Sequence, residues 1–102
     1  MRLSGQNLRA GMAGDEVAEL HAELILLGFA IPDTERRDQV FGVGTAQAVA
    51  AFQKAHGLRE TAVVDRRVAA ALTRTERRQV VADFHIALAN AINLIRRLLR
   101  VA

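Results

Sequence analysis

The strongest structural signal lies in the middle of the chain, where residues 41–58 read FGVGTAQAVAAFQKAHGL. Gly42 and Gly44 open this stretch with a turn, and Gly57 closes it where a helix favours a residue that tolerates a left-handed backbone. Between these glycines, apolar residues recur every three or four positions, which is the period of a helix with one buried face. They are Ala48, Val49, Phe52 and Ala55. We therefore expect a central helix with Phe52 on its buried face.

The segment before it predicts a first amphipathic helix from about Asp15 to Leu27. Asp15 and Glu16 place negative charge at the helix N-terminus, and Gly28 ends the helix. Its apolar face follows spacings of three and four and comprises Val17, Leu20, Leu24 and Leu27. We expect these residues to close the core around Phe52, with residues 1–13 as an ordered, non-helical lead-in.

Two further segments complete this part of the chain. Residues 34–39 are charged and form either a short helical turn or a loop. Asp65 is a good N-cap for a short third helix from residue 66 to about residue 72, because its carboxylate can accept the free N–H groups of the first turn. Val68, Ala71 and Leu72 are the inward candidates of that helix.

A second helix start is predicted at Thr73, because Glu76 follows three residues later as in a capping box. From there an apolar repeat runs without a break to the end of the chain. The residues of this interaction helix are Val80, Phe84, Ala87, Ala91, Leu94 and Leu98. We expect residues 1–74 to form a helical domain and residues 75–102 to form a long amphipathic helix. That helix packs on the domain, on another copy or on a missing downstream part; a membrane surface is the less favoured partner, because the basic residues gather at one end.

Composition narrows the function classes. The apolar fraction is 51% but aromatic residues make up only 4%, which favours close-packed aliphatic helices in a single domain of 102 residues. The net charge of +3 comes from arginines scattered among acids, so no nucleic-acid partner is expected. No run of eighteen uncharged apolar residues exists, so no membrane span is expected. No signal peptide is visible, which leaves the compartment open.

The sequence contains no residue pattern that indicates a catalytic or metal site. His21, His56 and His85 stand at no spacing that would suit a metal site, and we expect His21 to be at the surface or partly buried. Ser4 is the only serine and there is no cysteine. Glu19 and Glu23 are expected on a solvated helix face, not as a catalytic pair. We therefore expect no enzyme activity, no metal and no cofactor.

Three segments resemble a known family in their order and spacing. The first is residues 14–21 (GDEVAELH), which ends with LGF at 27–29. The second is residues 38–42 (DQVFG), followed by Thr45, Ala48, Val49, Phe52, Gln53, Gly57 and Leu58. The third is residues 63–65 (VVD) with Leu72. Together they resemble the peptidoglycan-binding domain found beside bacterial wall hydrolases, over about residues 8–72.

This resemblance implies an all-α, compact three-helix bundle, to which the chain adds the long C-terminal helix. It implies a non-catalytic module that tethers a larger bacterial protein to cell-wall glycan and peptide, in the cell envelope or exported. The alternative is a helical interaction or assembly module of a larger secreted or toxin-like protein that has lost wall binding, with a protein partner or self-association through residues 75–102. The candidate ligand-binding residues are Asp38, Gln39, Gly44, Thr45, Gln47 and Asp65.

Some positions depart from the family pattern. His21 stands where glutamine is usual, and Val68 stands where threonine is common. Gln39 and Ala62 each stand where a glycine is usual or common. Because the core positions are kept while several polar and turn positions are not, the pattern supports the fold more strongly than it supports wall binding.

Overall fold

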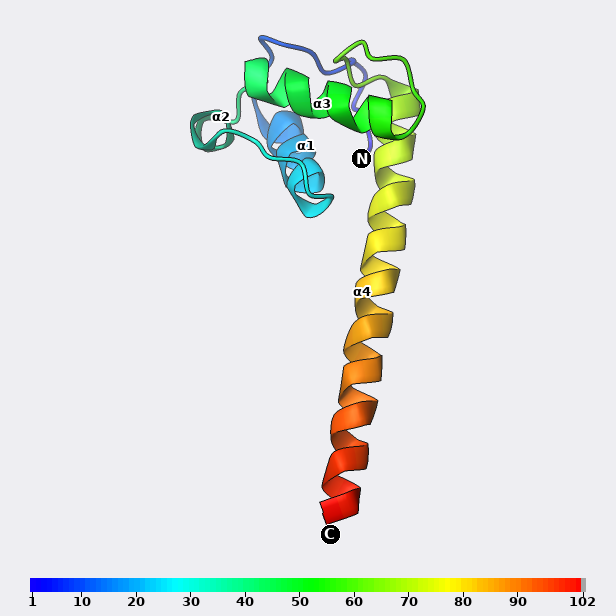
Figure 1. Ribbon diagram of the computed structural model, residues 1–102. Coiled ribbons are helices and arrows are strands. Elements are labelled where there is room, and N and C mark those ends of the chain that lie inside the picture. Colours follow the sequence, from blue (N-terminus) through cyan, green and yellow to red (C-terminus); the bar gives the residue numbers. More distant parts are fainter. Residues whose placement is uncertain (102) are drawn as a thin grey trace.

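The computed structural model describes residues 1–101; Ala102, the last residue of the predicted final helix, and the side chain of Val101 lie outside the described residues. Within residues 1–101 the chain forms four helices: α1 (Asp15–Leu26), α2 (Asp33–Asp38), α3 (Val43–Ala55) and α4 (Arg66–Val101). The first three helices and the start of α4 gather into a head, and the rest of α4 extends away from it (Figure 1). We call residues 1–75 the head and residues 76–101 the projecting segment.

Helix ends in the head follow the sequence signals. Gly28 adopts φ +91° just after α1, and Gly57 adopts φ +68° just after α3, as expected for residues that end helices. The sequence left residues 34–39 open as a short helical turn or a loop, and the structure shows a helix there, α2. Gln39 ends this helix in the left-handed conformation with φ +55°, and Ala62 adopts φ +58° in the loop before α4. These two residues are the ones that replace glycines of the family pattern.

The lead-in is ordered without being helical, as predicted. It crosses the head as an extended strap and pairs with two later segments. Leu8 exchanges backbone hydrogen bonds of 3.0 and 2.8 Å with Val64, just before α4. Phe41 N donates to Met12 O over 2.8 Å, just before α3. The strap thereby ties the segments that precede α3 and α4 to one another.

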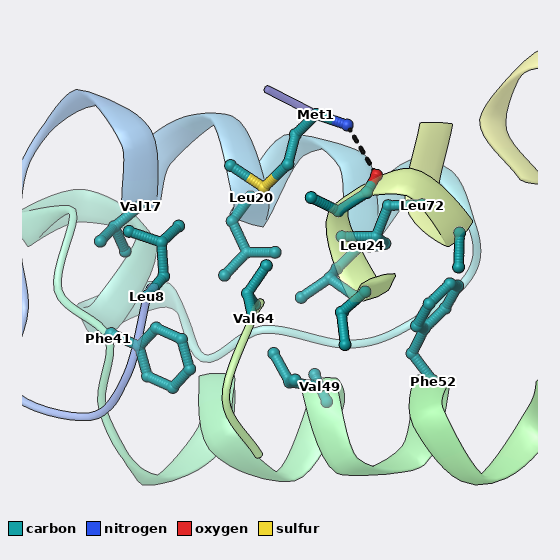
Figure 2. Packing of buried hydrophobic residues seen from close by; sticks show 14 of the residues in the cluster. Met1, Leu8, Val17, Leu20, Leu24, Phe41, Val49, Phe52, Val64 and Leu72 are labelled. Carbon is teal, nitrogen blue, oxygen red and sulfur yellow. Dashed lines mark hydrogen bonds between the residues drawn. The ribbon is translucent and has the colours of Figure 1, made fainter. Parts of the chain in front are cut away.

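The core of the head forms where α1, α3 and the first turns of α4 face the strap (Figure 2). Phe52 belongs to this core and has no exposed surface, and the ring of Phe29 meets it edge-on at 6.0 Å between centroids. The predicted partners of Phe52, namely Val17, Leu20, Leu24 and Val49, are all buried. Leu8, Phe41, Val64 and Leu72 fill the remaining space. The prediction of an aliphatic bundle around Phe52 is confirmed.

Helix α4 corrects one prediction. Asp65 caps it as expected, since its Oδ1 accepts the N–H of Val68 at 2.9 Å. The predicted second helix start at Thr73 is wrong, because α4 continues through this position without interruption. The Thr73 hydroxyl donates instead to the carbonyl of Ala69, one turn earlier, at 3.1 Å. The capping-box pattern therefore lies inside a helix, where the hydroxyl satisfies itself on the preceding turn.

Beyond Glu76, the projecting segment packs on no other described part of the chain. Every side chain from Arg77 to Arg100 is exposed. The molecule consequently measures 61 × 28 × 23 Å, an elongation that comes from this one helix. The sequence left three packing partners open for this helix: the head, another copy or a downstream part. The structure shows that it does not pack on the head. None of the described helices has the length and apolarity needed to cross a membrane.

Candidate functional site

The N-terminus of α3 is capped by a carboxylate from α2. Glu35 Oε1 accepts the backbone N–H groups of Gly42 and Thr45, each at 2.9 Å, and Oε2 accepts that of Gly44 at 3.0 Å. The Thr45 hydroxyl donates to the same Oε1 at 2.8 Å. A negative charge that accepts the free N–H groups at a helix N-terminus is favourable, because the helix dipole is positive there. Partial burial raises the pKa of Glu35, but these hydrogen bonds outweigh it and hold the pKa below its ordinary value.

This arrangement continues into the core through His21. Its Nε2 lies 2.8 Å from Thr45 Oγ1, and because the Thr45 hydroxyl already donates to Glu35, the imidazole must donate here. His21 is only 3% exposed, so it is more deeply buried than the expected surface or partly buried position. Burial lowers its pKa, and the nearby Glu35 carboxylate opposes this effect only in part. His21 is therefore a neutral structural donor.

Two of the predicted ligand-binding residues belong to this capping arrangement. Thr45 is fully buried, and its N–H and hydroxyl are both used by Glu35. The N–H of Gly44 is used as well, and a Cβ at Gly44 would lie 2.3 Å from Pro32 Cγ, so only glycine fits. Sequence reasoning missed Glu35. The signal was present, since a carboxylate shortly before a glycine-rich helix N-terminus is a natural capping candidate.

Two grooves lie beside the N-terminal half of α3. One, of about 580 Å³, is lined by Val40, Phe41, Val43, Ala46 and Gln47 together with the strap, and its walls are almost wholly apolar. The other, of about 470 Å³, lies between α3 and the segment that follows α1. The exposed side chain of Gln47 lines both grooves, and Gly44 lines the second. Asp38 and Gln39 are exposed at the end of α2 and line neither groove.

A third depression, of about 480 Å³, lies at the other end of the head, between the end of α3 and the start of α4. Its walls are mainly polar and carry amide, hydroxyl, carboxylate and guanidinium groups. The residues are Gln53, Leu58, Arg59, Thr61, Asp65, Arg67 and Val68. Of the six predicted ligand-binding residues, only Asp65 lines this depression. The other five lie elsewhere in the head. No sequence pattern links Asp65 to Arg59 and Arg67.

Gln53 holds the wall of this polar depression in place. Its side-chain amide donates to the Thr61 hydroxyl at 3.0 Å and to the Val63 carbonyl at 3.2 Å, and its oxygen accepts the Ala62 N–H at 3.0 Å. A buried glutamine with all of its groups satisfied fixes the loop that it contacts. The guanidinium groups of Arg59 and Arg67 are exposed and, within residues 1–101, form no ion pair. They remain available to an anion.

Glu23 and His56 have structural roles in the head. Glu23, expected on a solvated face, is only 9% exposed and lies 3.2 Å from the amino group of Met1, which also donates to the carbonyl of Ala69 (Figure 2). Burial, aided by a hydrogen bond with Glu76, raises the pKa of Glu23 to about 7. The His56 ring stacks on Phe52 with 4.3 Å between centroids. No three metal-ligating side chains meet anywhere in the part of the chain that the structure describes.

The chain matches the model of a known domain family and is similar to solved structures. The model of a family described as a putative peptidoglycan binding domain matches residues 13–72. The chain is similar to the SleB N-terminal domain, with 29% identity and a TM-score of 0.67, over 74% of this chain and 99% of that one. It is also similar to a peptidoglycan-binding protein from Clostridioides difficile in complex with glutamine hydroxamate, with 31% identity and a TM-score of 0.59. That similarity covers 66% of this chain but only 40% of the other. No curated protein matches the chain.

Proposed function

Because this chain belongs to the family of putative peptidoglycan-binding domains, we propose that it is a non-catalytic module that attaches a larger bacterial protein to the cell wall. The family match across residues 13–72 carries this proposal, and it spans α1, α2, α3 and the start of α4. The chemistry of the head agrees with it. His21, Glu35 and Thr45 are occupied with holding the fold together and are not arranged as an acid, a base and a nucleophile around an open site.

The polar depression is the surface that fits this ligand. Peptidoglycan consists of a polar glycan with short peptides, whose carboxylates need cationic partners and whose hydroxyl and amide groups need hydrogen-bonding partners. Arg59 and Arg67 supply two unpaired guanidinium groups. One carboxylate oxygen of Asp65 caps α4, which leaves the other to accept from the ligand. We infer that these three residues hold a peptide carboxylate and an adjacent hydroxyl or amide of the wall polymer.

The N-terminus of α3 is the second surface to test. Its backbone N–H groups cannot bind a ligand, because Glu35 occupies them. What remains of the predicted set there are the exposed side chains of Asp38, Gln39 and Gln47, beside a groove with apolar walls. Such a groove suits methyl groups better than sugar hydroxyls. We therefore infer that the ligand binds in the polar depression around Asp65, and that Gln47 marks the alternative site.

Co-sedimentation of the full chain with purified insoluble peptidoglycan tests the proposal. The double variant Arg59→Glu/Arg67→Glu is expected to lose retention by about tenfold or more, because two attractive charges become repulsive toward peptide carboxylates. Arg74→Glu/Arg77→Glu, equally exposed on α4, is the matched control and retains binding. Loss in Gln47→Glu but not in the arginine variant would move the site to the N-terminus of α3. No retention of the unmodified chain would reject wall binding.

A second function is favoured by one observation, the exposed apolar face of the projecting segment. If the unmodified chain binds no peptidoglycan, we propose that the module serves in assembly through this segment, as part of a larger secreted or toxin-like protein. The two proposals are separable, because substitutions in the head affect only the first and substitutions in the projecting segment affect only the second.

A further inference from the structure

The projecting segment carries a wide apolar stripe that nothing in the described chain covers. Phe84 is 64% exposed, Leu94 58% and Leu98 63%. These residues follow a strict seven-residue repeat, in which positions a and d form the seam of a coiled coil. With Val80 at d, the a positions after Val80 hold Phe84, Ala91 and Leu98, and the d positions hold Val80, Ala87 and Leu94; Arg77 lies at the a position before Val80. The repeat therefore predicts a helical partner.

The flanking positions of the repeat are sorted by polarity. The g positions are polar: Glu76, Asp83, Asn90 and Arg97. The e positions are apolar: Val81, Leu88 and Ile95. In a parallel pair g of one helix faces e of the other, which would set charged groups against apolar ones. In an antiparallel pair g faces g and e faces e, so polar groups meet polar groups and apolar groups meet apolar groups.

We propose that the projecting segment binds the same segment of a second copy of this chain, in antiparallel orientation and centred on Asn90. In this register Asp83 lies beside Arg97 of the second copy, and by symmetry Arg97 lies beside Asp83 of the second copy. Asn90 meets its own counterpart, where two amides can exchange hydrogen bonds. This charge complementarity identifies the occupant as the chain itself, because the g row of one helix is acidic at one end and basic at the other and so matches a second, antiparallel copy.

The same register matches side-chain sizes across the seam. Phe84 packs with Leu94 of the second copy, and Val80 packs with Leu98 of the second copy. At the centre Ala87 meets Ala91 of the second copy, so large residues meet large ones and small residues meet small ones. On the e side, Leu88 meets its counterpart and Val81 meets Ile95 of the second copy. The two heads lie at opposite ends of the pair.

Disulfide trapping tests whether the two helices are antiparallel. The sequence contains no cysteine, so any disulfide that forms must join the introduced residues. In the proposed register Val80 and Leu98 of the second copy share a layer, whereas the two copies of Val80 lie about 27 Å apart along the helix axis. A mixture of Val80→Cys and Leu98→Cys chains is therefore expected to form the mixed disulfide, and neither variant alone is expected to cross-link. Cross-linking of Val80→Cys with itself would show a parallel pair and overturn the proposal.

Sedimentation tests whether the pair forms at all. Phe84→Glu is expected to weaken the dimer about a hundredfold, because it buries a charge in the seam. Ile86→Glu is the matched control, since Ile86 is 61% exposed but lies at position c, on the polar face, and its substitution leaves the dimer intact. A chain that stays monomeric overturns the proposal, whether it remains free or binds vesicles of anionic phospholipid. Either result leaves peptidoglycan binding by the head untouched.

Discussion

The head and the projecting segment use the same sequence pattern but meet different surroundings. In both, apolar residues recur at spacings of three and four, and in both a phenylalanine lies on the apolar face. Phe52 is fully buried in the head, whereas Phe84 is 64% exposed on the projecting segment. An apolar stripe therefore predicts that a helix needs a partner, but it does not say whether that partner lies in the same chain.

Removing the two phenylalanine rings should give the largest difference between the regions. Phe52→Ala is expected to lower the free energy of unfolding of the head by about 3–5 kcal/mol, because it leaves a cavity among well-packed residues. Phe84→Ala is expected to change it by less than about 0.5 kcal/mol, because this ring contacts nothing in the head. Chemical denaturation of dilute protein measures both. A similar loss in Phe84→Ala would show that the projecting segment packs on the head.

The next largest effect should come from the cap of α3. Glu35→Ala removes the acceptor of three backbone N–H groups and one hydroxyl and is expected to cost about 2–3 kcal/mol of unfolding free energy. Glu60→Ala, at an exposed position, is the control and should cost little. Because the pKa of Glu35 is lowered in the folded state, its contribution is complete at neutral pH and is lost as the pH falls through that pKa. Thermal unfolding at pH 7 and pH 3 should therefore show a smaller effect of Glu35→Ala at the lower pH.

The fold of the head could be predicted from sequence because its signals are local. Gly28 and Gly57 end helices wherever they occur after an apolar run, and the stripe through Phe52 has the period of one buried face. The continuous helix α4 could not be predicted, because Thr73 and Glu76 match a capping box whether or not a helix precedes them. The helix predicted after Asp65 does not stop before Thr73, because the Thr73 hydroxyl donates to the carbonyl of Ala69 within that helix.

The candidate site was harder to predict than the fold. Thr45 and Gly44 were expected to face a ligand, because polar residues at a helix N-terminus often do so. The structure gives them Glu35 instead, a residue from a segment whose conformation the sequence left open. In the same way, Arg59 and Asp65 come together only because the loop between α3 and α4 is folded back by Gln53. Sites that depend on such loop conformations cannot be assembled from spacing alone.

A smaller effect should distinguish a buried from an exposed glutamate on α1. The folded-state pKa of Glu23 is raised to about 7 by burial, so the folded protein binds a proton more tightly than the unfolded chain. Glu23 therefore reduces the free energy of unfolding progressively as the pH rises from about 4.5 to 7, by about 2 kcal/mol in all. Glu23→Gln should remove this pH dependence, whereas the exposed Glu19→Gln should keep it. Unfolding curves at pH 5, 6 and 7 measure the difference, and identical slopes for both variants would refute this role of Glu23.

The smallest effect should come from alanine-to-glycine substitutions, which we expect to stabilise the head at one position and to destabilise the projecting segment at another. Ala62 in the head adopts φ +58°, a conformation that glycine adopts without strain, so Ala62→Gly is expected to stabilise the head by about 0.5–1 kcal/mol. Ala89 lies within the regular helix of the projecting segment, where Ala89→Gly is expected to cost about 1 kcal/mol of helix stability. Circular dichroism should show the second change as lost helicity, with the unfolding midpoint of the head unmoved.

Gln39→Gly, at the other left-handed position, should stabilise the head as Ala62→Gly does. If neither glycine stabilises the head, the two departures from the family pattern are not backbone strain, and a contact of the Gln39 or Ala62 side chain must have replaced what glycine provides in the family.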